Sequence, residues 1–261
     1  MMTDEKLIGI HAKVERANNH LSDLDAASRA FCDTQEDQIR SSVNPNTGER
    51  TYYGPPDRDV PVEIAIIAGD AVHNLRSALD HLAYQLLLAN GNNPTRNTYF
   101  PICDDASDYP KNCAERTKGM SEKAIARIGE AKPYKGGNDT LWRLHKLDII
   151  DKHRLLFTTC VLNPSHSITP SQVAGASRTF PGKPPVPHDL QIASPIRSIP
   201  LKTGVELLTV PRSDAGAPIK FRFIIAFNEP EIFTEPISIM ALQPMASFIE
   251  DFTASFKPLL V

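Results

Sequence analysis

The sequence predicts an α+β protein, with an N-terminal helical bundle followed by a small, mostly antiparallel sheet and a C-terminal helix. Apolar residues recur every three or four positions through much of residues 1–157, which is the period of an amphipathic helix. Residues 163–200 lose this period and are rich in Pro and Ser, which predicts long surface connections. We therefore divide the chain into a helical region, 1–157, and a β-rich region with a closing helix, 158–261. Whether the second region packs as one domain with the first stays open.

The helical region begins with a helix predicted over residues 3–40, whose apolar stripe is flanked by alternating charges. A connector rich in Asn, Pro and Gly follows at 41–61 and holds a short strand-like run at 51–53. The clearest helical pattern of the chain covers 64–88. Asn90-Gly91 directly after it provides a good C-terminal stop.

Two more helices are predicted before the β-rich region. Residues 92–110 are expected to form a loop, in which the apolar run 99–102 is a buried anchor. A short helix follows over 121–131, with Ser121 as its N-cap. The last helix of this region covers 139–157.

The β-rich region contains four strand-like runs, at 158–162, 190–192, 204–210 and 219–227. The last run alternates at first and then becomes wholly apolar, which is typical of a central strand. Residues 236–260 have a strongly apolar side and predict a closing helix.

Composition is that of an ordinary globular protein, with 41% hydrophobic residues, 23% charged residues and a net charge of −3. So small a net charge argues against a dedicated nucleic-acid coat or membrane-surface binder. No apolar run is long enough for a transmembrane helix, and no signal region begins the chain. The four cysteines show no C-x-x-C spacing, which fits reduced thiols. We therefore expect a cytoplasmic protein.

The helix at 64–88 has an unusual polar side. Its apolar stripe stays within about 40° of one line on a helical wheel. The opposite arc lacks Lys and Glu, which usually cover a solvated helix face. We call it the polar arc, and it consists of Asp70, His73, Asn74, Arg76, Ser77, Asp80, His81, Tyr84 and Gln85. This composition indicates a polar network or a functional site.

The helix at 139–157 carries two carboxylates, Asp148 and Asp151, on the same side as its leucines. A carboxylate aimed into an apolar interior needs a cation or hydrogen-bond donors, because burying it unpaired costs several kcal/mol. The polar arc offers such donors. We therefore predict that helices 64–88 and 139–157 pack together, with Asp148 or Asp151 meeting Arg76 or a histidine. A structural ion-pair network explains this pattern as well as catalysis does.

Two other chemistries have weaker motifs. A di-metal centre of a metal-dependent hydrolase would draw on four histidines and four aspartates, namely His73, His81, His145, His153, Asp70, Asp80, Asp148 and Asp151. However, each histidine pair is eight residues apart, and there is no H-E-x-x-H motif. Ser77 lies four residues before His81 and thus on the same helix side, but no G-x-S-x-G motif surrounds it.

Charge is unevenly distributed along the chain. Residues 111–154 hold eleven Lys and Arg against six Asp and Glu, a local net charge of +5. Such a segment would attract RNA or another phosphate-bearing ligand. Ordinary surface lysines, balanced by the acidic first helix, are the alternative explanation.

Arg76-Ser-Ala-Leu-Asp-His81 resembles the R-x(4–6)-H signature of HEPN domains, which are helical bundles that include metal-independent endoribonucleases of bacterial toxin and defence systems. The resemblance implies that Arg76 holds the scissile phosphate and that His81 acts on the 2′-hydroxyl or leaving group. It further implies RNA cleavage or RNA binding without a cofactor, in a homodimer. The residues expected to support this pair are His73, Asn74, Ser77, Asp80, Asp148, Asp151, Lys152 and His153.

The strings 73–81 and 144–154 also resemble a set of bacterial proteins, a likeness that implies a family but no activity. Three interpretations therefore stand. The first is the HEPN-like RNA-cleaving or RNA-binding protein. The second is a non-catalytic bacterial protein with a structural His/Arg/Asp network between helices. The third is the metal-dependent hydrolase.

Overall fold

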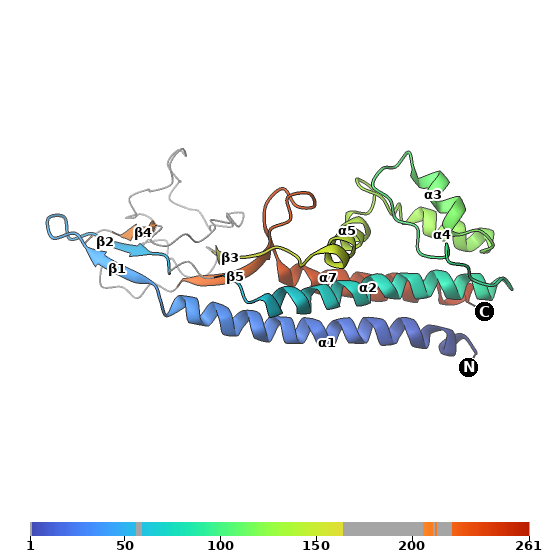
Figure 1. Ribbon diagram of the computed structural model, residues 1–261, viewed down its shortest axis with the longest axis horizontal. Coiled ribbons are helices and arrows are strands. Elements are labelled where there is room, and N and C mark those ends of the chain that lie inside the picture. The colour runs from blue at the N-terminus through green and yellow to red at the C-terminus, as the bar shows by residue number, and fades with distance from the viewer. Residues whose placement is uncertain (1, 56–58, 164–205, 211, 213–220, 261) are drawn as a thin grey trace. The chain divides into compact units, whose positions relative to one another are not determined.

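The computed structural model describes residues 2–55, 59–163, 206–210, 212 and 221–260 (Figure 1). In chain order its elements are α1 (Met2–Glu36), β1 (Arg40–Val43), β2 (Arg50–Tyr53), α2 (Val62–Ala89), α3 (Tyr109–Arg116), α4 (Glu122–Glu130), α5 (Asp139–His153), β3 (Thr158–Asn163), β4 (Glu206–Val210), β5 (Arg222–Phe227), β6 (Ile237–Ser238), the 3-10 turn η2 (Ile239–Ala241), α7 (Leu242–Ala254) and the 3-10 turn η3 (Lys257–Leu259). Helices, small antiparallel sheets and a C-terminal helix confirm the α+β prediction.

The chain divides into two compact units, each assembled from separate stretches of sequence. The first unit comprises Met1–Asp25, Glu63–Leu156 and Met240–Val261. The second unit comprises Ala26–Val62 and Phe157–Ile239. The candidate site described below lies entirely in the first unit.

The core of the first unit forms where the apolar sides of α1, α2, α5 and α7 meet (Figure 1). The predicted stripe of α2 is fully buried, because its seven residues are at most 1% exposed: Ile64, Ala68, Ala71, Leu75, Leu79, Leu82 and Leu86. Ile10 and Leu24 of α1 and Ile249 of α7 are buried to the same degree. Each fully buried Leu or Ile side chain of this core stabilises the fold by about 1.5–3 kcal/mol.

Smaller features of the first unit were also predicted. The run 99–102 is a buried anchor as expected, with Phe100 0% exposed and Ile102 5% exposed. Ser121 is the N-cap of α4, because its side chain accepts a hydrogen bond from the backbone N–H of Ala124 at 3.3 Å. These local signals therefore predict the local structure correctly.

Three predicted boundaries and one predicted loop were wrong. The first helix ends at Glu36 instead of 40, and β1 begins at Arg40. The helix predicted over 139–157 ends at His153, and the tail 236–260 is divided into β6, η2, α7 and η3. The loop 92–110 stops where α3 begins. That helix has only eight residues and buries one cysteine, so it lacks an apolar stripe, although Pro110 in its first turn is a start signal.

The second unit contains two antiparallel three-stranded sheets, in the orders β1-β2-β4 and β3-β5-β6. In the first sheet Thr51 lies opposite Thr209, and their hydroxyls are 2.8 Å apart. In the second sheet β5 is the central strand, as its apolar run predicted. The predicted strand 190–192 and residues 164–200 of the surface connections lie outside the described residues.

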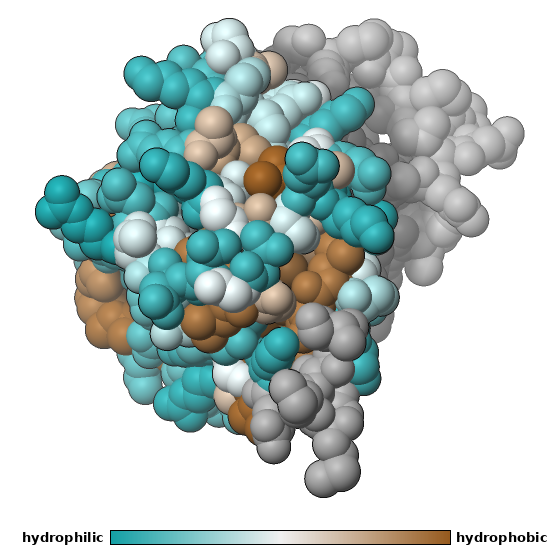
Figure 2. Space-filling model, turned by 90° about the vertical axis from the view of Figure 1, so that its right-hand side faces the viewer, coloured by the Kyte–Doolittle hydropathy of each residue, from teal (hydrophilic) through white to brown (hydrophobic). Residues whose placement is uncertain are grey.

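On the face shown in Figure 2 hydrophilic residues predominate, and hydrophobic residues occupy small separate areas. Among the helices that the structure describes, none is both long and apolar enough to cross a bilayer. All four cysteines are free thiols.

Candidate functional site

Helices α2 and α5 pack together, as predicted, and polar contacts from part of the polar arc join them along what we call the α2–α5 seam. The inner half of the seam is centred on Arg76 and includes Asp80, His145 and the backbone of Phe100. The outer half consists of His73, Ser77, Asp148 and Lys152.

Arg76 is buried, with 4% of its surface exposed, and each of its three guanidinium nitrogens donates a hydrogen bond. Nη1 donates to Asp80 Oδ1 at 2.6 Å, Nη2 to the Phe100 carbonyl at 3.0 Å and Nε to His145 Nδ1 at 3.3 Å. Asp80 Oδ1 also accepts the backbone N–H of Phe100 at 2.9 Å. Arg76 therefore ties α2 to α5 and to the buried anchor at 99–102.

His145 is the neutral partner in the inner half. Burial and the adjacent positive charge of Arg76 lower the pKa of His145 to about 4. Since its Nδ1 accepts a hydrogen bond from Arg76, the ring proton of the neutral imidazole must lie on Nε2. From the sequence His145 is a candidate only as a metal ligand, and its position next to Arg76 is not predicted.

The outer half is built around the carboxylate of Asp148, whose side chain is only 2% exposed. Its Oδ1 lies 3.2 Å from His73 Nδ1, and its Oδ2 accepts a hydrogen bond from Lys152 Nζ at 2.6 Å. The side chains of His73 and Lys152 are 52% and 53% exposed. The prediction that Asp148 or Asp151 meets a histidine across the seam is confirmed for Asp148.

Ser77 extends the outer half by one more contact. Its Oγ lies 3.5 Å from His73 Nε2, on the opposite side of the ring from Asp148. Helical spacing predicts that Ser77 lies beside His81, which is also four residues away. The structure instead brings together Ser77, His73 and Asp148.

Asp151 packs at the edge of the seam, against the backbone of α2 at Gly69. Burial and the negative charges of Asp148 and Asp70 raise the pKa of the Asp151 carboxyl. Asp151 therefore contributes a third carboxyl group to this side of the first unit.

His81 lies apart from Arg76. The two residues are five positions apart on α2, which separates their directions by about 140°. His81 is exposed and contacts α1 near Gly9. It lines an open hollow of about 500 Å³, whose other lining residues are Gly9, Asp80, Tyr84, Gln85 and Thr98. Asp80 is the residue that both binds Arg76 and borders this hollow.

The remaining predicted residues do not join either half. Asn74 accepts a hydrogen bond from Lys13 of α1 at 3.3 Å and donates to the Asp70 carbonyl at 2.8 Å. His153 is exposed at the end of α5. Their proposed supporting roles are therefore not supported by a contact with Arg76 or His81.

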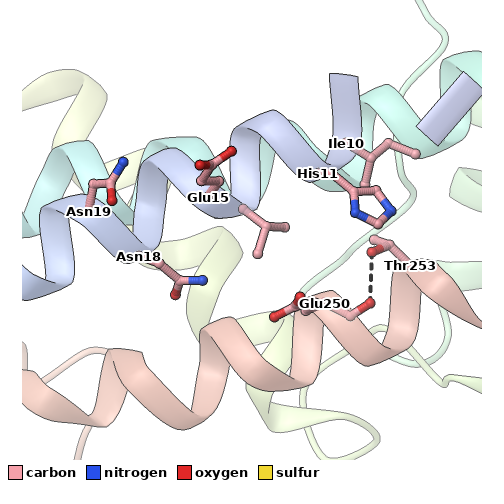
Figure 3. Close-up of a pocket in the computed structure, with 8 residues that line it drawn as sticks. Ile10, His11, Glu15, Asn18, Asn19, Glu250 and Thr253 are labelled. Atoms are coloured by element: carbon pink, nitrogen blue, oxygen red, sulfur yellow. Dashed lines mark hydrogen bonds between the residues drawn. The ribbon is translucent and has the colours of Figure 1, made fainter. Parts of the chain in front are cut away.

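A separate pocket of about 270 Å³ lies between α1 and α7 (Figure 3). Glu15 and Glu250 line it together with His11, Asn18 and Asn19. Two carboxylates at its border disfavour an anionic ligand. None of the residues singled out from the sequence lines this pocket.

Several cations of the basic segment 111–154 form ion pairs. Four of its eleven cations pair with carboxylates, namely Arg116, Arg127, Lys146 and Lys152. Asp104, outside the segment, accepts hydrogen bonds from Lys146 Nζ at 3.2 Å and from the indole N–H of Trp142 at 2.8 Å. Of the four carboxylate partners, Glu115, Glu130 and Asp148 are already included in the local net charge of +5, and only Asp104 comes from outside the segment.

Within the described ranges, no group of three or more His, Cys, Asp or Glu side chains is arranged to hold a metal ion. The hydrolase interpretation therefore gains no geometric support. No protein-family model, curated protein or solved structure matches the chain.

Proposed function

We propose that the Arg76 network is a structural brace and that the first unit serves as a helical scaffold, not as an Arg76-dependent ribonuclease. The observation that carries this proposal is that each of the three guanidinium nitrogens of Arg76 donates a hydrogen bond to a partner in its own unit. A buried charge whose every nitrogen is engaged fixes helix register and segment position.

The same contacts weigh against RNA cleavage by the R-x4-H motif. To hold a phosphate, Arg76 would have to leave Asp80 and His145 and cross from the interior to solvent. Breaking a buried charged network of this kind costs about 3–5 kcal/mol. In addition, Arg76 is buried in the seam, whereas His81 lines the open hollow of about 500 Å³. The guanidinium and the imidazole therefore do not face one reacting group.

Replacing Arg76 tests the brace directly. We expect Arg76→Ala to lower the free energy of unfolding by about 3 kcal/mol, because the Phe100 carbonyl and His145 Nδ1 lose their donor and the partly exposed Asp80 carboxylate loses its cation. Arg127→Ala is the matched control, since Arg127 also pairs with a helical carboxylate, Glu130, but is 48% exposed. We expect that variant to lose less than about 1 kcal/mol. Chemical denaturation followed by circular dichroism measures both.

RNA degradation in the presence of EDTA separates the brace from the nuclease. Because His81 is exposed, His81→Ala is expected to keep the fold, and wild type and variant are expected to leave RNA equally intact. Cleavage by the wild type that His81→Ala abolishes in a folded protein would overturn the proposal. So would an Arg76→Ala variant as stable as the Arg127→Ala control.

A further inference from the structure

The hydroxyl of Ser77 differs in its contact from other helical serines of the first unit. The hydroxyls of Ser22 and Ser247 donate to the backbone carbonyl four residues earlier, which is the common arrangement inside a helix. Ser77 instead faces the imidazole of His73, four residues earlier. An imidazole in this place can take a proton from the hydroxyl, which a carbonyl cannot.

The proton positions in the outer half follow from Asp148. A carboxylate only accepts hydrogen bonds, so His73 Nδ1 must carry the proton that lies between them. In the neutral ring this leaves the lone pair of Nε2 facing Ser77 Oγ. The chain of donors therefore runs from the Ser77 hydroxyl to His73 and from His73 to Asp148.

The surroundings keep this chain in place and open to solvent. Asp148 is almost fully buried, and Lys152 occupies its second oxygen, so the carboxylate is fixed in one position. His73 is half-exposed, and Ser77 is partly exposed. The order of groups, with a buried carboxylate, an oriented imidazole and a hydroxyl, is that of the Ser-His-Asp arrangement in acyl transfer.

We propose that Ser77, His73 and Asp148 form a nucleophilic centre that accepts an acyl group from an activated carboxylic ester. Ser77 Oγ attacks the ester carbonyl carbon while His73 Nε2 takes the hydroxyl proton. The bond to the leaving alcohol breaks, and His73 returns the proton to that oxygen. Water then hydrolyses the acyl-serine by the same proton path, releasing a carboxylic acid and restoring Ser77.

The position of Ser77 within α2 defines the substrate class. Its backbone N–H belongs to the helical hydrogen-bond ladder, so it does not serve as an oxyanion donor. Lys152 provides the positive charge of the outer half. The centre therefore suits small esters with a good leaving group, such as aryl esters, which need the least stabilisation of the developing oxyanion.

The experiment treats the full chain with p-nitrophenyl acetate and follows p-nitrophenol release, the intact mass and the modified peptide. In samples quenched before water hydrolyses the acyl-serine, we expect one acetyl group on Ser77. Release is expected to fall about tenfold or more in Ser77→Ala and in His73→Gln. Ser247→Ala is the matched control and is expected to react like the wild type. Thermal unfolding checks that each variant is folded. We expect Ser77→Ala to keep α2 intact, because Ala is a better helix former than Ser.

Acetylation of Ser77→Ala at the wild-type rate would overturn the proposal, as would acetyl groups on lysines or Ser247 but not on Ser77. Neither result would contradict the proposal that the Arg76 network is a structural brace. The brace depends on Arg76, and the two tests therefore fail independently.

Discussion

Gly69 shows how one missing side chain shapes the α2–α5 seam. A β-carbon at Gly69 would overlap the Asp151 carboxylate. Glycine within a helix costs about 1 kcal/mol relative to alanine. The chain tolerates that cost because only glycine lets the acid approach the α2 backbone.

Substituting Gly69 tests this close approach. We expect Gly69→Ala to destabilise the protein by about 1–3 kcal/mol, because Asp151 must be displaced. Gly129 of α4 is the matched helical control. A β-carbon there meets only the Tyr109 hydroxyl at 3.9 Å, so Gly129→Ala is expected to stabilise by about 1 kcal/mol. Denaturant titrations measure both variants. Adding Asp151→Ala should rescue Gly69→Ala, and equal stabilisation by both alanines would contradict the close approach.

The partner of Ser77 shows where residue-level prediction ends. Helical spacing places His73 and His81 equally near Ser77, so the sequence alone cannot choose between them. The choice is made by other helices, because Asp148 of α5 holds His73 whereas His81 contacts α1 near Gly9. The need of Asp148 for a partner was predictable from its apolar surroundings. The identity of that partner depends on how the helices are rotated about their axes.

At the scale of elements, the α2–α5 seam couples two helices through ionisable groups. His145 contributes a neutral imidazole beneath Arg76, with Asp148, Asp104 and Lys146 as the other charges acting on it. Because the folded protein lowers the pKa of His145 to about 4, it excludes a proton that the unfolded chain binds below its ordinary value of about 6.5.

This difference in pKa predicts an acid-sensitive seam. The contribution of His145 is fully present above pH 6.5 and is lost as the pH falls toward 4, by about 1.4 kcal/mol per pH unit. We expect the wild type to lose about 2 kcal/mol more than His145→Gln between pH 7 and pH 5. Urea titrations at the two pH values measure the difference. Parallel losses in both proteins would place the acid sensitivity elsewhere.

Long elements were predicted better than short ones, for a physical reason. The apolar stripe of α2 extends over several turns, and all of its residues are buried, so its period identifies the helix clearly. In contrast, β1 has four exposed residues, and its strand exists because β2 pairs with it. Such elements are specified by partners that lie elsewhere in the chain.

At the scale of the whole molecule, the first unit is closed by its most C-terminal segment. Phe256 and Leu260 are fully buried, and Phe252 packs edge-on against Phe100 of the anchor with ring centres 5.7 Å apart. Phe252 also contacts Phe256 edge-on at 5.1 Å. The C-terminal aromatic residues thus complete a core that the preceding helices leave open.

Truncating one of these rings measures that contribution. We expect Phe256→Ala to lower the free energy of unfolding by about 3–5 kcal/mol, because it leaves a cavity in a closed core. Ile8→Ala is the control within the same unit, since Ile8 is 63% exposed, and it is expected to change stability by less than about 0.5 kcal/mol. Calorimetric unfolding of the three proteins distinguishes them. Similar melting of Phe256→Ala and wild type would contradict the role of this segment.

The first unit is assembled from three separate stretches of the chain, and this determines when it can fold during synthesis. A ribosome makes α1 and α2 long before α7, so their leucine-rich sides stay uncovered until α7 is synthesised. During that interval the nascent chain exposes apolar surface of the kind that chaperones recognise. Translation must therefore run almost to residue 260 before this unit can reach its native state.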